Sequence, residues 1–150
     1  MSAHEVVLGL QWINATITGD TTLMSLVPGG CYRGVAPKED VSGNPLVPPF
    51  AIFNFVSGSD KTSMNGYRCL VRALFQIKAT GLGDAAHATA VASAAARIDT
   101  LFGGPVRGTT TGGIIHSCIR ENPIAYDEPI VAGTWWTHFG GIYEILIEAT

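Results

Sequence analysis

The sequence predicts an α+β fold, in which a mostly antiparallel β-sheet is packed by an N-terminal helix and one long alanine-rich helix. Apolar residues recur at helical spacing near the N-terminus and again in residues 84–102. Apolar and polar residues alternate instead in residues 67–79 and 140–148, as in strands with one buried face. Strand-like segments come in pairs before and after the long helix, which favours hairpins. The 150 residues fit one domain, residues 1–150.

The N-terminal elements follow from spacing and capping signals. Residues 3–17 place apolar side chains at helical spacing and predict a first helix that ends near Gly19. Asp20 is a suitable N-cap for a short second helical turn that runs through Leu26. Residues 31–35 predict a short strand.

The next segment predicts a hairpin preceded by a loop. Prolines and a Gly-Asn pair in residues 36–49 indicate an exposed loop. Residues 50–56 are β-branched or aromatic and predict a strand, whereas the polar residues 57–66 predict a long hairpin loop. The clearest strand is 67–79. Its expected buried face holds Tyr67, Cys69, Val71, Ala73, Phe75, Ile77 and Ala79.

The second half of the chain predicts one helix and two strands. Asp84 is the expected N-cap of a helix that runs to about Phe102, and the Gly-Gly-Pro sequence 103–105 ends it. Strands are expected at 114–120 and 140–148. The turns expected between them are Asn122-Pro123 and Asp127-Glu128-Pro129.

Composition limits the functions that this chain can have. Hydrophobic residues make up 47% and charged residues only 14%, against about 25% charged in an average soluble domain. Part of the apolar surface is therefore expected to be covered by a partner subunit. The net charge is −3 and basic residues form no cluster, which argues against sequence-independent binding of nucleic acid.

The cysteines indicate a reducing compartment. Cys31, Cys69 and Cys118 are odd in number and far apart, so free thiols are expected rather than a disulfide framework. The first residues lack the basic start and apolar run of a signal peptide. We therefore expect a protein made in the cytosol.

No motif in the sequence predicts a catalytic, cofactor or metal site. The four histidines, His4, His87, His116 and His138, lie in four separate segments. His116 and Cys118 are expected on one strand face, but two ligands are too few for a metal site. The sequence has no G-x-S-x-G elbow, and residues 81–83 are only weakly similar to a nucleotide-binding turn. We expect no enzyme activity, no cofactor and no metal.

An aromatic group precedes the last predicted strand. Trp135 and Trp136 stand beside His138 and Phe139. Such aromatic residues either close a core or anchor a contact with another protein. Core packing is the favoured interpretation, and Trp135, Trp136 and Phe139 remain candidate contact residues.

The order and character of these segments resemble the tail terminator, or tail-completion, proteins of long-tailed bacteriophages. The similarity is carried by the N-terminal helix, the sequence Leu-Val-Pro-Pro-Phe-Ala-Ile-Phe-Asn-Phe, the strand 67–79, the helix 84–102 ending in Ala-Arg-Ile-Asp-Thr-Leu-Phe, and the strand Ile-Tyr-Glu-Ile-Leu-Ile-Glu. It covers most of the chain but includes no invariant motif. The Trp-Trp pair and the proline-rich loop have no counterpart among the features that define this family.

The resemblance implies a structural virion protein of the viral tail and neck, assembled in the host cytoplasm. Such subunits form a ring, typically hexameric, at the head-proximal end of the tail tube. The ring ends tube polymerisation and joins the tail to the head connector, and DNA passes through its lumen without specific binding. The implied partners are further copies of the chain, the tube protein and the connector or neck protein, with no membrane.

If the chain forms such a ring, its loops are candidate contact segments. The residues concerned are Lys38, Glu39 and Asp40 in the loop 36–49, and Asp60 and Lys61 in the loop 57–66. Solvated turns are the alternative for both loops. Two further functions stay open: a head-completion or adaptor protein of the neck, and a small ligand-binding α+β domain, which requires a concave pocket with converging polar groups.

Overall fold

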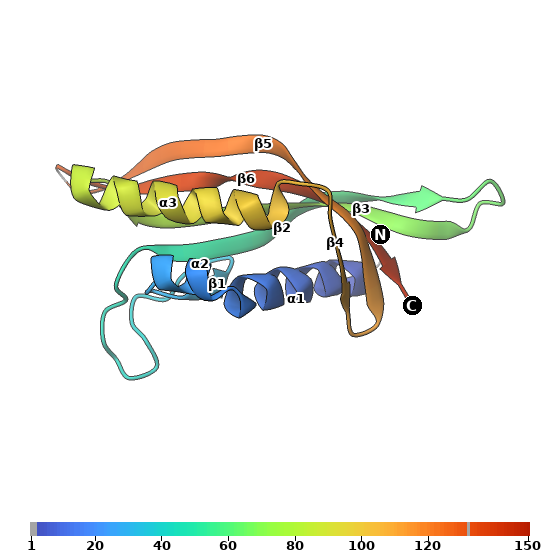
Figure 1. The fold of residues 1–150 in the computed structure, drawn as a ribbon, viewed down its shortest axis with the longest axis horizontal. Helices are drawn as coiled ribbons and strands as arrows, with labels where there is room; N and C mark the ends of the chain where they lie inside the picture. The colour runs from blue at the N-terminus through green and yellow to red at the C-terminus, as the bar shows by residue number, and fades with distance from the viewer. Residues whose placement is uncertain (1–2, 132) are drawn as a thin grey trace.

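The computed structural model describes residues 3–131 and 133–150, within which the chain forms three helices and one sheet of six strands (Figure 1). In chain order they are α1 (Ala3–Gly19), α2 (Thr21–Leu26), β1 (Cys31–Arg33), β2 (Phe50–Thr62), β3 (Arg68–Leu82), α3 (Ala85–Phe102), β4 (Val106–Thr110), β5 (Gly113–Val131) and β6 (Thr134–Ala149). The predicted α+β class is confirmed.

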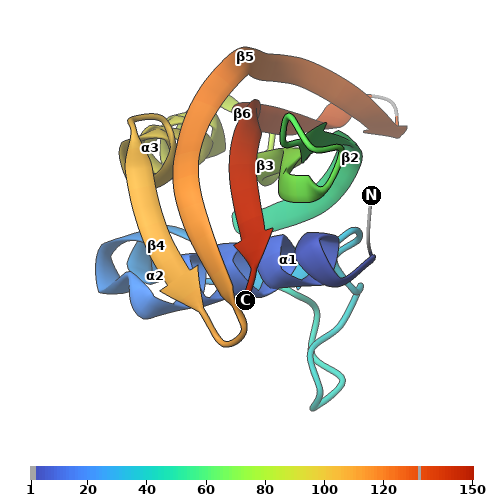
Figure 2. The ribbon, with the colours of Figure 1, turned by 90° about the vertical axis from the view of Figure 1, so that its right-hand side faces the viewer.

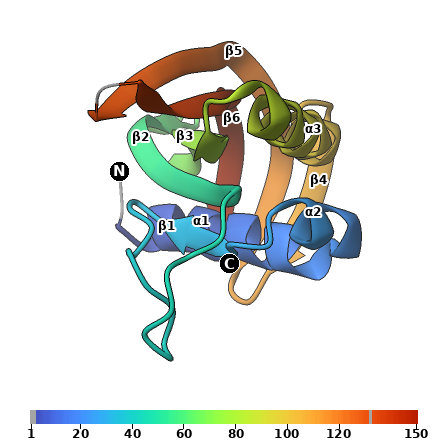
Figure 3. The same cartoon turned by 90° about the vertical axis from the view of Figure 1, so that its left-hand side faces the viewer.

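The sheet is mostly antiparallel. Its strand order is β1-β2-β3-β6-β5-β4, and only the β1–β2 pair is parallel. Figures 2 and 3 show that the sheet curves, with α1 crossing its open side. We call the face that carries the helices the inner face, and the opposite one the outer face.

The core lies between the inner face and the two long helices. The central strands contribute fully buried side chains in strict alternation: Val71, Ala73, Phe75, Ile77 and Ala79 from β3, and Tyr143, Ile145 and Ile147 from β6. Trp12 of α1 packs edge-on against Phe102 of α3 at 5.5 Å, and Phe102 packs against Tyr143 at 5.9 Å. Gly9 lets α1 approach closely, because a Cβ there would lie 2.6 Å from the ring of Phe75.

Both predicted helix caps are confirmed. The Asp20 carboxylate accepts a hydrogen bond from the Leu23 amide at 2.7 Å, and the Asp84 carboxylate accepts one from the His87 amide at 2.9 Å. Arg97 of α3 donates two hydrogen bonds to Asp20, at 3.1 and 2.6 Å. The cap of α2 therefore also ties α2 to α3.

The predicted hairpin forms, but its strands are longer than expected. β2 continues to Thr62, so the predicted loop 57–66 is wrong over most of its length. The polar residues there stay extended because their main chain pairs with β3, from Ser57 opposite Leu74 to Thr62 opposite Arg68. Beyond the helices this pairing leaves both faces in water. Tyr67 and Cys69 are therefore exposed rather than buried, which corrects that end of the predicted face.

The two turns predicted between positions 120 and 130 are also wrong. β5 runs through Asn122-Pro123 and Asp127-Glu128-Pro129 without ending. β4 pairs only with Gly113–Cys118, so the rest of β5 is a sheet edge on that side. Edge strands and bulges tolerate proline, because no ladder hydrogen bond is needed from its nitrogen. Register shifts next to Asn122 and Pro129 absorb the irregularity.

Three smaller differences have local causes. The predicted strand 31–35 ends at Arg33, because Gly34 turns the chain with φ of +79°. The short strand β4 carries two threonines and a glycine, and no pattern in the sequence predicts it. A register shift between Ile115 and Ser117 places His116 and Cys118 differently from expectation. Cys118 is buried, whereas the half-exposed His116 lies 2.6 Å from Glu148.

Candidate assembly surface

The outer face of the sheet mixes charged and apolar side chains. Between the buried inner positions, the alternate residues of β3 and β6 are only half-buried: Arg72, Leu74 and Gln76 on β3, and Ile142, Glu144 and Leu146 on β6. α1 and α3 both pack on the inner face. The outer face is therefore not covered by the two long helices.

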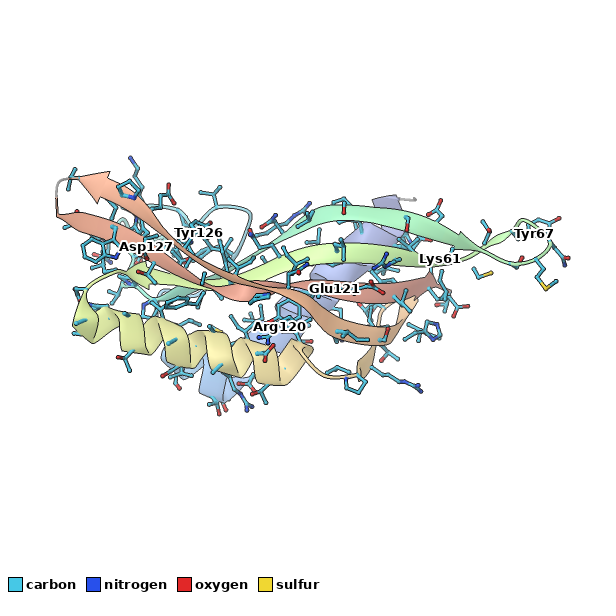
Figure 4. All side chains as sticks on the ribbon, turned by 90° about the horizontal axis from the view of Figure 1, so that it is seen from above. Lys61, Tyr67, Arg120, Glu121, Tyr126 and Asp127 are labelled. Atoms are coloured by element: carbon cyan, nitrogen blue, oxygen red, sulfur yellow. The ribbon has the colours of Figure 1, made fainter. Side chains whose placement is uncertain are left out.

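A charged cluster crosses the centre of the outer face. Arg72 of β3 forms an ion pair with Glu144 of β6, and its guanidinium lies 3.8 Å from Glu121 of β5. The hydrogen bond from Arg72 is the main cause that lowers the pKa of Glu144, and the same bond raises the pKa of Arg72. Both groups are therefore charged at neutral pH. Figure 4 shows Lys61, Glu121 and Arg120 along this part of the sheet.

A second polar group lies near the β5–β6 end of the sheet. The ammonium of Lys78, which is buried, donates a hydrogen bond of 2.7 Å to the hydroxyl of Tyr126. The Tyr126 ring stacks on the imidazole of His138, with centroids 4.4 Å apart and planes 13° from parallel. β3, β5 and β6 thus each contribute one side chain, and the three side chains hold one another in place.

His138 is neutral in this environment. Its imidazole is almost fully buried, with Nδ1 3.0 Å from Thr80 Oγ1 and Nε2 3.2 Å from Glu128 Oε2. Burial lowers the pKa of His138, and the nearby charge of Lys78 lowers it further. The Glu128 side chain is 62% exposed and can accept a hydrogen bond from the neutral ring.

A pocket of about 480 Å³ opens beside His138. Its wall on the sheet side consists of Phe50, Ile52, Thr80, Trp136 and His138, and its rim of Val35, Ala36, Pro37, Lys38, Leu46, Glu128 and Ile130. Most of these side chains are apolar, and a few polar groups converge on the space. This is the composition expected of a site that receives an apolar group from a partner or a ligand.

The opposite end of the molecule carries a protruding hairpin tip, which we define as residues 61–70. Figure 1 shows β2 and β3 extending beyond the helices, and Figure 4 places Tyr67 at this end and Tyr126 and Asp127 at the other. The Met64 side chain is fully exposed and that of Tyr67 is 76% exposed. Two large side chains are therefore presented to solvent at the far end of a long ribbon.

The candidate contact residues from the two predicted loops lie at these two ends. Lys38 borders the pocket, and Glu39 pairs across the loop with Pro45. The Asp40 carboxylate accepts hydrogen bonds from the amides of Ser42 and Asn44, which lower its pKa, the bond from Asn44 more than that from Ser42. Asp60 and Lys61 lie on β2 where it approaches the hairpin tip. Their roles in contact stay predictions.

The three aromatic candidates lie within β6 rather than before it. Trp136 lines the pocket and packs against Phe50 at 5.6 Å. Trp135 covers Gly83, where a Cβ would collide with its indole nitrogen, and its carbonyl accepts a hydrogen bond from the Gly83 amide at 2.9 Å. Phe139 is partly buried against the core. Core packing is thus present at Phe139, while Trp135 and Trp136 retain exposed surface.

Several surface residues escape sequence reasoning. Tyr126 and Ile130 flank the predicted turn Asp127-Glu128-Pro129, and Val35 lies at a predicted strand end. Met64 and Tyr67 flank an Asn-Gly turn, and a large apolar residue in such a turn is the one signal that points to an exposed anchor.

The reactive side chains of the described residues show no arrangement suited to metal binding. Within residues 3–131 and 133–150, no three His, Cys, Asp or Glu side chains gather as metal ligands. The three cysteines are free thiols, as predicted, and burial raises the pKa values of Cys31 and Cys118 to about 12. Among the described residues, no helix has the length and apolar character to span a membrane.

Comparison with solved structures finds a chain of similar fold. No protein-family model matches the chain, and no curated protein matches it. A chain from the solved structure described as "Virion of native gene transfer agent (GTA) particle" aligns over 99% of this chain and 100% of its own length. The TM-score is 0.65 and the sequence identity is 17%. The protein therefore shares the fold of a chain found in a phage-like particle.

Proposed function

We propose that the protein is a non-enzymatic structural component of a phage-like virion, and that it acts as a tail terminator. In this role several copies, most simply six, form a ring at the head-proximal end of the tail tube. The ring ends tube polymerisation, joins the tail to the head connector and leaves a lumen for DNA.

The observation that carries this proposal is the end-to-end fold similarity to a chain of a gene transfer agent virion. Fold alone does not define function, so the site must agree with it. Here it does: the outer face, the pocket and the hairpin tip all present partly exposed apolar groups beside charged ones. The net charge of −3 suits a lumen that DNA passes without adhering.

The test measures both assembly and tube capping. Native mass spectrometry gives the mass of the purified protein, alone and after mixing with tail tubes. The tubes are assembled from the tube protein that the same genome encodes. We expect six-fold rings on one end of each tube, and tubes that stop growing when fresh tube protein is added. Tubes without the protein are the control. Tubes that keep growing and carry no cap would refute the proposal.

An adaptor protein of the neck is distinguished by the same experiment. Rings that bind the portal or connector but leave tube growth unchanged would assign the protein to the neck. The pocket favours one further candidate, a small ligand-binding domain. That function predicts a bound small molecule in native mass spectra of the monomer, and no change in tube growth.

A further inference from the structure

The hairpin tip lacks the cover that the rest of the sheet has. β1 pairs only with residues 51–53 of β2, and β6 pairs with β3 only from Val71 onward. In the described chain, the pairs Lys61–Leu70 and Thr62–Arg68 therefore belong to a ribbon of two strands. An isolated two-stranded ribbon is marginally stable in water and gains most from a partner surface.

The tip is nevertheless pre-formed. The amide of Ser63 donates to the carbonyl of Tyr67 at 2.7 Å, and the amide of Gly66 donates to the carbonyl of Ser63 at 2.9 Å. Gly66 has φ of +79°, the left-handed geometry that such a tight turn requires. Met64 and Tyr67 are thereby presented on a closed turn, so the turn does not have to form when they dock, and the main entropic cost is the rotamer freedom of the two side chains.

The pocket matches the hairpin tip in size and in apolar character. Its 480 Å³ can receive one or two large side chains, and exposed Val35 and Ile130 border it. Lys38 and Glu128 both border the pocket, so its rim carries one basic and one acidic residue. At the other end of the molecule, the exposed Met64 and Tyr67 present an apolar surface. The tip and the pocket therefore match in size and in apolar character.

The two surfaces lie at opposite ends of the same molecule (Figure 4). One chain therefore cannot satisfy its own pocket, but a second copy can. Two different, complementary patches make a head-to-tail contact, and such contacts close into a ring when the rotation between neighbours is right.

We propose that the hairpin tip of each copy inserts Tyr67 and Met64 into the pocket of the next copy. This inference rests on the proposed ring and names the contact that builds it. A tyrosine buries roughly 150–250 Å². A standard interface covers about 800 Å² on each side, so the surface around the tip and around the pocket contributes the remainder.

The first experiment uses three variants of the full chain. Tyr67→Asp disables the tip and Ile130→Asp disables the pocket rim. Val41→Asp is the matched control, because Val41 is fully exposed on the loop 34–49 and lies outside the pocket. All three sites are exposed, and thermal unfolding followed by circular dichroism verifies that each variant folds like the wild type.

Native mass spectrometry and sedimentation then give the masses. We expect the wild type and Val41→Asp to form rings. Tyr67→Asp and Ile130→Asp should be monomers, with the affinity of self-association reduced at least 100-fold in each. An equimolar mixture of the two disabled variants should form a one-to-one dimer. In that mixture one intact tip meets one intact pocket, and neither end of the dimer can extend.

A cross-link tests the geometry directly. In a Cys69→Ser background, Tyr67→Cys and Ile130→Cys are expected to form a disulfide between copies under mild oxidation. Cys118 is buried and Cys31 half-buried, and burial raises the pKa of both thiols, so they oxidise more slowly than an exposed cysteine. The single variant Tyr67→Cys in the same background is the control and should give no ladder of cross-linked copies.

The outcomes separate this inference from the proposed function. Rings that survive both Tyr67→Asp and Ile130→Asp overturn the tip-in-pocket contact but leave a ring-forming terminator in place. If Tyr67→Asp still forms rings but no longer caps tubes, the tip contacts the tube protein instead. That result also overturns the tip-in-pocket contact. A wild type that stays monomeric at the highest attainable concentration overturns it as well, and tube capping then decides the function separately. A small molecule found in the pocket, with association unaffected, excludes a second copy as the occupant.

Discussion

The base and the tip of the β2–β3 hairpin are built from the same two strands but differ in what covers them. At the base, Phe53 and Phe75 are buried under the helices and their neighbours in the sheet. At the tip, Met64 and Tyr67 meet only solvent. The comparison teaches that alternation along a strand fixes which way side chains point, whereas burial depends on how far the covering layer extends. One element can therefore serve as core at one end and as contact surface at the other.

The largest effect is expected at the base. Phe75→Ala removes a fully buried ring that touches α1 and packs against Phe55 at 5.7 Å. We expect a loss of about 3–5 kcal/mol in the free energy of unfolding, measured by denaturant titration. Leu74→Ala, the half-exposed neighbour on the outer face, is the control and should cost less than about 1.5 kcal/mol. Equal costs would break the distinction between the two faces.

A glycine in the middle of the sheet gives the next effect. A Cβ on Gly140 would collide with the carbonyl oxygen of Ile77 and lie 2.5 Å from the Cα of Lys78, so backbone must move. We expect Gly140→Ala to destabilise the protein by about 1–3 kcal/mol in the same titration. Gly104→Ala, where nothing lies within 4 Å, should stay within about 0.5 kcal/mol of the wild type. A neutral Gly140→Ala would show that β3 and β6 separate easily.

The link between α2 and α3 tests the covering layer itself. Asp20→Ala removes both the cap of α2 and the partner of Arg97, and we expect it to cost about 0.5–2 kcal/mol. Asp20→Asn keeps a capping oxygen but loses the charge, so it separates the two contributions. The hydrogen bond from Arg97 lowers the pKa of Asp20, so the contribution of this charge is complete above about pH 4. It should disappear as the pH falls through the lowered pKa, and Asp20→Asn should flatten that loss. If Asp20→Asn loses stability in acid as steeply as the wild type, the Asp20 carboxylate is not the source of the acid loss.

A smaller, pH-dependent effect is expected beside the pocket. The pKa of His138 is lowered in the folded state, chiefly by burial, so the unfolded chain binds the extra proton first. Stability should therefore fall as the pH drops below about 6.5 and level off below the folded pKa, with a slope of at most about 1.4 kcal/mol per pH unit from this group. His138→Gln should flatten the profile in chemical denaturation, and exposed His87→Gln should retain it. An unchanged profile in His138→Gln would remove the histidine from the explanation.

The smallest effect on stability is expected at the tip. Tyr67→Ser should change the free energy of unfolding by no more than about 0.5 kcal/mol, because the ring contributes little to the core. Amide hydrogen exchange of the monomeric variant should be fast in residues 61–70 and slow in residues 51–55. Protection of the tip equal to that of the base would erase the contrast between the two ends.

Local signals allow a good part of the fold to be predicted. Asp20 and Asp84 are recognisable caps, because a side chain that accepts from an amide three residues later needs no tertiary context. The inner face from Val71 to Ala79 follows from alternation alone. Strand length does not follow in the same way. Ser57–Thr62 and the prolines of β5 are extended because of their pairing partners, and sequence does not say which segments pair.

The candidate site was less accessible to prediction for the same reason. The pocket is assembled from five segments that are far apart in the chain, within residues 35–46, 50–52, 128–130 and 136–138 and at Thr80. Lys38 and Trp136, both predicted contact residues, line this pocket. His138 becomes buried only through that meeting, and the burial lowers its pKa.

The parallel pairing of β1 with β2 has a consequence for how this molecule can vary. Parallel neighbours need a crossover connection of roughly a dozen residues or more, which is usually a helix. Here residues 34–49 make the crossover without one, and Val35, Lys38 and Leu46 from it border the pocket. The length of this segment is imposed by the path of the chain, but most of its side chains are not needed by the sheet. Related proteins can therefore change what the pocket selects by rewriting the crossover, while the strands that it joins stay the same.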